Sequence, residues 1–178
     1  MKLYRAFPCD PTAAERDPGG SLFVPNGGAG RIDNPDLYRV LYASTHAAGA
    51  VAETFGRFPY WDDETFVHAN GNRYALAEYD VPNGLALFNM NDVAGLQELG
   101  LVPTEVIVRD RKVTQRWARE IYAKKAWSGI QWWSYYCSLW VCYGFWEYAG
   151  ITTVVTTALT TRHPAVIEAA HEIVRVVS

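Results

Sequence analysis

The sequence predicts an α+β fold, in which a mixed central sheet is flanked by helices. Segments dense in aromatic and β-branched residues, typical of strands, are interspersed with amphipathic helical segments without regular βαβ alternation. A length of 178 residues suits one hydrophobic core, and no linker, repeat or low-complexity segment divides the chain. We therefore expect residues 1–178 to form a single compact domain.

The first third of the chain predicts two strands and one helix around a long loop. The expected elements, in order, are a strand at residues 3–8, a loop at 9–34, a strand at 38–43 and a helix from about 46 to 57. The helix carries Ala47, Val51 and Phe55 as an apolar stripe, with Ser44 or Thr45 as its N-cap, and Pro59 ends it. A structureless loop this long is more often functional than incidental.

The rest of the chain predicts five strands and three helices. Strands are expected at residues 74–80, 85–88, 129–137, 139–146 and 151–157, and helices at 91–99, 113–124 and 165–177. Gly100 is expected to end the first of these helices, and Pro164 is expected at the first position of the last.

Charge and hydropathy exclude two classes of partner. The net charge is −3, and Lys and Arg are scattered, so the sequence offers no basic stripe for a phosphate backbone. The N-terminal MKLYRAFPCD has no apolar signal region, and no apolar run approaches the roughly 18 residues of a membrane span. We expect a cytoplasmic protein that contacts neither nucleic acid nor membrane directly.

The three cysteines, Cys9, Cys137 and Cys142, form neither a CxxC motif nor a cluster spaced with histidine. We therefore expect no disulfide framework and no metal site, and we interpret the cysteines as small buried hydrophobic residues. A cysteine hydrolase that pairs Cys137 or Cys142 with a histidine is an alternative without any local signature.

Three charged residues lie in segments where they could take part in binding or catalysis. Arg5 lies in an otherwise apolar strand, so its guanidinium must reach an anion or the sheet edge. Arg31 follows the glycine cluster at residues 27–30, either as a phosphate-binding loop or as an ordinary surface loop. Glu53 follows a run of small residues, either as a solvated helix charge or as a catalytic group facing a cleft.

These features occur together in an order that resembles the RES domain family. The resemblance rests on LYRAFP, GAGRIDNP, RVLYASTHAAGAVAETFG and WSGIQWWS, which span about two-thirds of the chain. The spacing from Arg31 through Tyr42 to Glu53 looks like the family signature. The chain departs from it at Ile32 and Asp33, where the family usually has an aromatic residue and Asn.

The resemblance implies an ADP-ribosyltransferase-like fold and a toxin that consumes NAD⁺ as its substrate. Such a toxin cleaves the nicotinamide–ribose bond, by hydrolysis or phosphorolysis, and is neutralised by a cognate antitoxin of the Xre helix-turn-helix type. The alternatives are a mono-ADP-ribosyltransferase that modifies a protein target and a non-catalytic interaction module. The sequence leaves the acceptor open between water, phosphate and a protein side chain.

The resemblance also assigns roles to residues. Glu53, Tyr42 and Arg5 are the predicted catalytic residues, with Glu53 stabilising an oxocarbenium-like transition state. Arg5 and Arg31 are expected to clamp the pyrophosphate, because planar guanidinium groups bind it in a bidentate manner. Tyr42 is expected to provide an aromatic platform for the pyridinium ring.

A serine completes the predicted NAD⁺ site. We favour Ser134, which is expected to hydrogen-bond the nicotinamide or the ribose, and Ser128 is its competitor. The aromatic run between Trp127 and Trp146 is interpreted as core with at least one exposed patch, which would favour an antitoxin interface or a homodimer.

Overall fold

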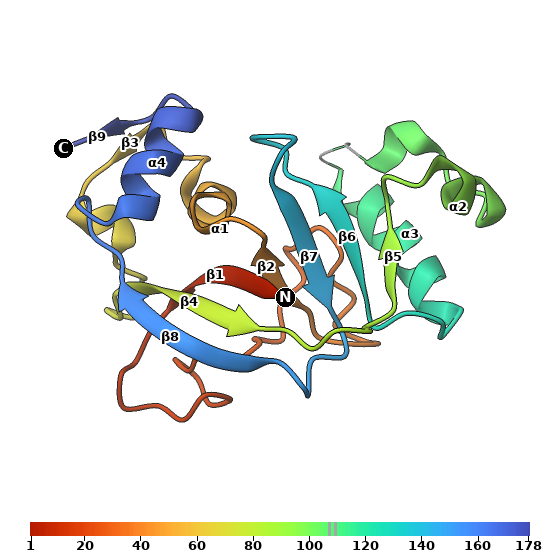
Figure 1. The fold of residues 1–178 in the computed structure, drawn as a ribbon, viewed down its shortest axis with the longest axis horizontal. Coiled ribbons are helices and arrows are strands. Elements are labelled where there is room, and N and C mark those ends of the chain that lie inside the picture. Colours follow the sequence, from red (N-terminus) through yellow and green to blue (C-terminus); the bar gives the residue numbers. More distant parts are fainter. Residues whose placement is uncertain (107, 109) are drawn as a thin grey trace.

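The computed structural model describes residues 1–106, 108 and 110–178 of the chain. One mixed seven-stranded sheet has the order β5-β6-β7-β2-β1-β4-β8 (Figure 1). Its strands are β1 (Lys2–Pro8), β2 (Leu41–Ser44), β4 (Tyr74–Asp80), β5 (Leu87–Asn89), β6 (Gly129–Trp133), β7 (Val141–Phe145) and β8 (Thr152–Ala158). Neighbouring strands are antiparallel except β5 and β6, which are parallel, so the predicted α+β class with a mixed sheet is confirmed.

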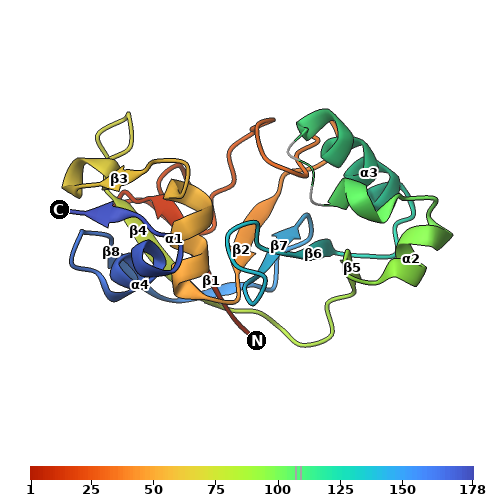
Figure 2. The ribbon, with the colours of Figure 1, turned by 90° about the horizontal axis from the view of Figure 1, so that it is seen from above.

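Four α-helices lie at the two ends of this sheet. They are α1 (Ala47–Phe55), α2 (Val93–Glu98), α3 (Arg111–Ala123) and α4 (Pro164–Glu172). Short 3₁₀ helices η1 (Asp63–Phe66) and η2 (Pro103–Val106) and a parallel ribbon of β3 (Tyr60–Trp61) and β9 (Val176–Val177) complete the described part. Figure 2 shows α1 and α4 at one end and α2 and α3 at the other, with β2 and β7 between them.

The sheet splits between β1 and β2. Strand β1 pairs with β4 at every position from Lys2 to Pro8, but it pairs with β2 only at Tyr4 and Ser44. The β1-β4-β8 and β2-β7-β6-β5 groups therefore diverge, and Figure 1 shows them running in different directions. Helix α1 packs against both β1 and β2 at this divergence.

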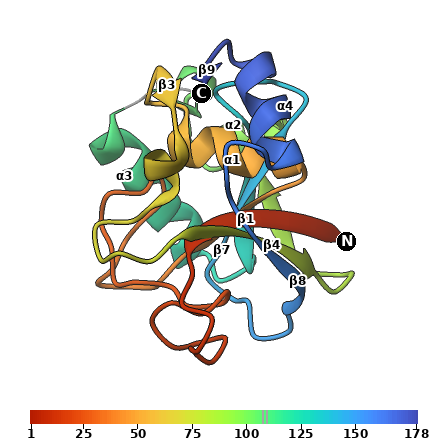
Figure 3. The same ribbon diagram turned by 90° about the vertical axis from the view of Figure 1, so that its left-hand side faces the viewer.

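Three apolar clusters hold the layers together. One joins α1 and α4 to the β1-β4 half and includes Val51, Phe55 and Val166, and another joins α3 to β6 and β7 through Trp117, Ile121 and others. A third lies on the opposite face of the sheet, between the sheet and the loop of residues 9–25. Figure 3 shows this loop below the sheet and α1 and α4 above it. Each helix pair thus has its own core, and the site lies between the pairs.

Several predicted elements have other limits in the structure, and the strand predicted at 129–137 ends at Trp133. Strand β2 begins only at Leu41, because Tyr38 forms an isolated bridge with Asn34 instead. The terminal helix ends at Glu172, where Val174 adopts a left-handed backbone with φ of 54° and the chain turns into β9.

The N-cap of α1 is also shifted from the prediction. His46 is the N-cap of this helix and makes no side-chain cap bond, while Ser44 Oγ accepts from the His46 backbone N–H at 3.3 Å. Ser44 therefore holds the turn that leads into α1 rather than the first turn of the helix itself.

Candidate functional site

A cavity of about 340 Å³ lies where the sheet splits, between α1 and the N-terminus of α3. Its walls bring together residues from six helices and strands and from the glycine loop. The polar and charged side chains among them include Arg5 on β1, Arg31 in the loop, Tyr42 on β2, Glu53 and Thr54 on α1, Arg111 on α3, and Cys142 on β7. Four predicted site residues, Arg5, Arg31, Tyr42 and Glu53, thus line one cavity.

Glu53 is held by two donors from the β6-β7 hairpin. Ser134 Oγ donates to Glu53 Oε1 at 2.5 Å, and Cys142 Sγ donates to the same oxygen at 3.6 Å. Burial and the Glu53 carboxylate raise the pKa of the Cys142 thiol well above its usual value, so the thiol keeps its proton and acts as a donor. Glu53 itself is exposed on the cavity side of α1, in position to contact a bound molecule.

The two candidate serines have different surroundings. Ser134 is buried just after β6, where its Oγ also accepts from the Tyr136 backbone N–H at 3.1 Å. It is outside the cavity lining and reaches the cavity through Glu53. Ser128 Oγ instead donates to Glu147 Oε2 at 2.9 Å on an exposed surface, away from the cavity lining. The structure therefore brings Ser134, and not Ser128, to Glu53.

Two arginines of the cavity, Arg31 and Arg5, donate hydrogen bonds to backbone carbonyls. Arg31 Nη1 donates to Val106 O at 2.9 Å and to Val108 O at 3.1 Å, while Arg5 Nη1 donates to Ser21 O at 3.0 Å. Burial, and then the neighbouring Arg111, lower the pKa of Arg31 from its usual value. Like charges that lower a cation's pKa indicate a site that would gain from a bound anion.

Arg111 is a third cation of the cavity, and sequence reasoning missed it. It is the first residue of α3, after the N-cap Asp110, whose side chain accepts from the Lys112 N–H at 2.8 Å. Within the described residues, the arginines in ion pairs with carboxylates are Arg116 and Arg119 rather than the three of the cavity. The predicted helix begins at residue 113, two residues after Arg111, so no signal in the sequence marks this arginine.

The glycine loop is fixed rather than free to close. Asp33 Oδ2 accepts from the Gly30 backbone N–H at 2.8 Å, and Asp33 Oδ1 accepts from the Tyr42 hydroxyl at 2.6 Å. The Tyr42 hydroxyl also accepts from the Ile32 N–H at 3.1 Å. A Cβ at Gly30 would lie 2.3 Å from the Tyr42 hydroxyl and 2.5 Å from Asp33 Oδ1, so this position requires glycine.

The hydroxyl of Tyr42 stays protonated under ordinary conditions. Burial, and then the Asp33 carboxylate, raise the pKa of Tyr42 well above its usual value. Its ring meets the Trp132 ring edge-on, with centroids 6.3 Å apart and planes at 82°. Tyr42 thus anchors the loop through its hydroxyl, and its predicted role as a platform for a pyridinium ring stays a prediction.

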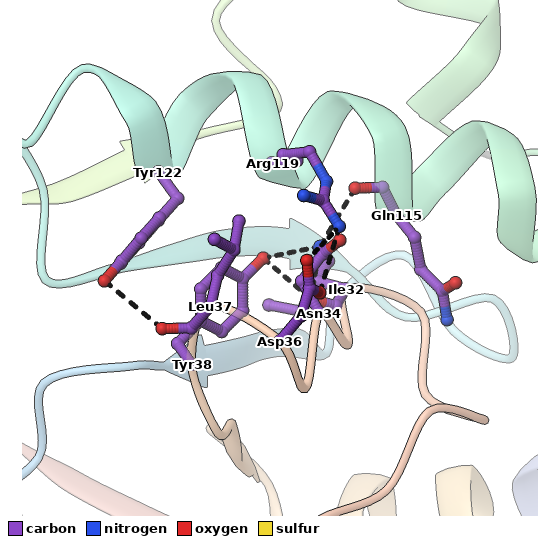
Figure 4. Close-up of polar contacts among 8 residues, drawn as sticks. All are labelled: Ile32, Asn34, Asp36, Leu37, Tyr38, Gln115, Arg119 and Tyr122. Atoms are coloured by element: carbon purple, nitrogen blue, oxygen red, sulfur yellow. Dashed lines mark hydrogen bonds and ion pairs between the residues drawn. The ribbon is translucent and has the colours of Figure 1, made fainter.

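Helix α3 donates hydrogen bonds to the other side of the glycine loop. Gln115 Nε2 donates to Gly28 O at 2.8 Å and to Gly30 O at 2.9 Å. Figure 4 shows the adjoining contacts. Asn34 Nδ2 donates to the backbone carbonyl of Gln115, and Arg119 forms a bidentate ion pair with Asp36 at 3.0 and 2.8 Å. The loop before Arg31 is therefore held in place by α3.

Comparisons with known proteins identify the family. The family model of the RES domain matches residues 2–165. The chain belongs to the RES domain family. A search of the curated proteins found no match to this RES-domain chain.

A solved structure supports the fold of this RES domain. The crystal structure of the M. tuberculosis MbcT-MbcA toxin-antitoxin complex contains a chain with a TM-score of 0.62 and 16% identity. The match covers 97% of this chain and 88% of that one. At this identity the likeness shows a shared fold.

Three further observations concern metal-binding clusters, cysteines and long apolar helices. Across residues 1–106, 108 and 110–178, no group of three or more His, Cys, Asp or Glu side chains is arranged to hold a metal ion. The three cysteines of this RES domain are free thiols. In that same part of the chain, no helix has the length and apolar character that a membrane crossing requires.

Proposed function

We propose that this RES domain is a toxin enzyme that consumes NAD⁺ by cleaving the bond between nicotinamide and ribose. One observation carries the proposal: the Glu53 carboxylate, held by Ser134, shares a cavity with three arginines that have no carboxylate partner in the described residues. In this proposal residues 1–178 act as one domain in the cytoplasm, without a metal ion.

Cleavage of the nicotinamide–ribose bond requires one carboxylate beside the ribose. When the bond between ribose C1′ and the nicotinamide nitrogen breaks, its electron pair leaves with the nitrogen and neutralises the pyridinium. Positive charge then develops on the ribose ring, and a carboxylate beside the ring stabilises it or holds a ribose hydroxyl. Glu53 takes this role because it is exposed to the cavity and held by two donors.

The same step leaves C1′ open to an acceptor. Water adds its oxygen there and loses a proton, which makes the enzyme a glycohydrolase, whereas inorganic phosphate makes it a phosphorylase. A protein side chain as acceptor makes it a mono-ADP-ribosyltransferase. We propose one of the first two reactions, because the cavity arginines suit a small anion as well as the substrate's own phosphates.

In this proposal the arginines bind the negatively charged pyrophosphate of the substrate. NAD⁺ carries a pyrophosphate, and guanidinium groups match it with parallel N–H donors. Arg5, Arg31 and Arg111 lie on three different segments around the cavity, so a bound pyrophosphate would be contacted from several sides. Tyr42 and Asp33 hold the loop that presents Arg31.

A protein partner is the second part of the proposal. The structural neighbour is a toxin-antitoxin complex, and the resemblance implies an antitoxin of the Xre helix-turn-helix type. Exposed apolar side chains on the β6-β7 hairpin, Tyr135 and Leu139 at 56% and 87% exposure, support an interface there with the antitoxin or with a second copy.

The test is a product analysis. The purified protein is incubated with NAD⁺, with and without inorganic phosphate, and free nicotinamide and the ribose product are identified by mass spectrometry. We expect nicotinamide release, with ADP-ribose as the product of hydrolysis or phosphorylated ADP-ribose as the product of phosphorolysis. No nicotinamide from folded protein would contradict the proposal and favour the non-catalytic interaction module.

A further inference from the structure

A second cavity of about 240 Å³ adjoins the first and shares two of its walls. Arg31 and Trp132 line both cavities, and Val106, Trp133 and Tyr135 complete the second. Among the described residues of its lining, two are tryptophans and one is a tyrosine, so aromatic rings make up much of its surface. Arg31 therefore lies between a charged cavity and an aromatic one.

We propose that this aromatic cavity binds the second base of the dinucleotide, the adenine of the substrate. The inference rests on the proposed function, because it starts from the nicotinamide end at Glu53. If that end lies at Glu53 and the pyrophosphate at Arg31 and Arg111, the adenylate must continue past Arg31. The aromatic cavity begins at that residue.

The residue types suit a flat base. Purine rings stack on aromatic side chains, and such stacking contributes substantially to nucleotide binding whatever the base. Trp132 is buried and Trp133 is half-buried, and both are fixed in strand β6 by register pairs with Cys142 and Val141. The backbone that carries these rings is thus ordered before a ligand arrives, which reduces the entropic cost of binding.

Another cavity next to the first fits the base less well. It has about 110 Å³ and shares Arg5 and Tyr42 with the main cavity. Its lining carries the charged side chains of Arg5, Asp33 and Arg39, and it offers one aromatic ring besides Tyr42, that of Tyr38. The larger aromatic cavity is therefore the better receptor for the adenine.

The experiment measures the binding of two fragments of the substrate, and free nicotinamide is assayed after each titration to exclude cleavage of nicotinamide mononucleotide. Titration calorimetry compares the affinity of ADP-ribose, which carries the adenine, with that of nicotinamide mononucleotide, which lacks it. The variants are Trp133→Ala and Tyr135→Ala, with Trp133→Phe to restore a ring. Leu139→Ala is the matched control, since Leu139 lies in the same hairpin, is 87% exposed and is outside the cavity lining.

We expect Trp133→Ala and Tyr135→Ala to weaken ADP-ribose binding by about tenfold each, the scale of one stacked base. Nicotinamide mononucleotide should bind the variants as it binds the wild type, and Trp133→Phe should recover most of the ADP-ribose affinity. Thermal unfolding checks that each variant folds, and Tyr135→Ala, at an exposed position, serves if Trp133→Ala does not.

The outcomes separate this inference from the proposed function. Weakened ADP-ribose binding in a protein that releases no nicotinamide would sink the proposed function and keep the adenine site. Unchanged ADP-ribose affinity in the folded variants, equal losses for both ligands, or a wild type that does not bind ADP-ribose would overturn the adenine site, whatever the enzyme does with NAD⁺.

Discussion

Ser134 Oγ donates a 2.5 Å hydrogen bond to Glu53 Oε1, across 81 residues of sequence. The bond joins the end of β6 to α1, so the carboxylate depends on the sheet as well as on its own helix. Ser134 is buried and lies outside the cavity lining, which makes it a positioning residue for Glu53 rather than a direct contact of the substrate.

Removal of this hydroxyl should slow turnover without weakening substrate binding. We expect Ser134→Ala to lower kcat for NAD⁺ loss by about 10- to 100-fold, the cost of a misplaced catalytic group, while KM changes little. Steady-state kinetics of nicotinamide release measures both constants. Ser128→Ala is the control, since Ser128 bonds Glu147 instead. Equal losses in the two variants, or a rise in KM alone for Ser134→Ala, would contradict the positioning role.

Arg111 should matter for binding rather than for the chemical step. We expect Arg111→Gln to raise KM for NAD⁺ about tenfold or more, because a charge-assisted bond to phosphate is lost. Arg116→Gln on the same helix is the matched control, since Arg116 pairs with Glu105 outside the cavity. Kinetics of both variants at varied NAD⁺ decides the matter. An unchanged KM in Arg111→Gln would remove this residue from the substrate site.

Alanine substitutions at two glycines of the loop test whether its conformation is needed for activity. Gly30→Ala places a methyl group against the Tyr42 hydroxyl and Asp33 Oδ1, so the loop that presents Arg31 must shift. We expect it to reduce kcat/KM about tenfold or more, given that a shift of about 1 Å in a site is costly. Gly28→Ala, whose new Cβ would have Pro35 Cγ at 3.9 Å, should behave like the wild type. Similar kinetics for both variants would show that the loop is adaptable.

Stability should fall at alkaline pH through the buried tyrosines. Burial raises the pKa of Tyr38 from its usual value of about 10 to about 12, so the folded state keeps a proton that the unfolded state releases. This contribution is complete below about pH 10 and is lost as the pH rises through about 12, by at most roughly 1.4 kcal/mol per pH unit.

Urea denaturation across this range measures the effect. The free energy of unfolding should decline more steeply above about pH 10 in the wild type than in Tyr38→Phe, which has no phenol to ionise. The variant should be less stable at neutral pH, because Tyr38 donates to Ile32 O at 2.9 Å and accepts from Asn34. Parallel pH profiles for the two proteins would contradict this origin of the alkaline loss.

The elements whose pattern is local were predicted well from the sequence. Strand β4 has the predicted limits, Tyr74 to Asp80, because the turn-forming residues 81–84 end it in the sequence as in the structure. The sequence does not specify which strands are neighbours: β4 and β5 follow each other along the chain, yet β7, β2 and others lie between them in the sheet. Neighbours in a sheet depend on long-range packing, which a local pattern does not carry.

The site was predicted in part for the same reason. Arg5, Arg31, Tyr42 and Glu53 carry signals in their own segments, and the structure brings them to one cavity. Gln115 and Arg111 carry none that separates them from other polar residues of an exposed helix, because their roles depend on where α3 docks. Asp33 stood out only as a departure from the family pattern, and it proved to be the acceptor that ties Tyr42 to the loop.

The most direct test of the account is the rate of nicotinamide release by Glu53→Gln. The side chain keeps its size and can still accept from Ser134, so folding and ADP-ribose binding should be retained while the negative charge is lost. We predict a fall of about 100-fold or more in kcat, the scale of electrostatic stabilisation of a transition state. Glu98→Gln, outside the cavity lining, should keep the wild-type rate. A Glu53→Gln enzyme that releases nicotinamide as fast as the wild type would contradict the central claim.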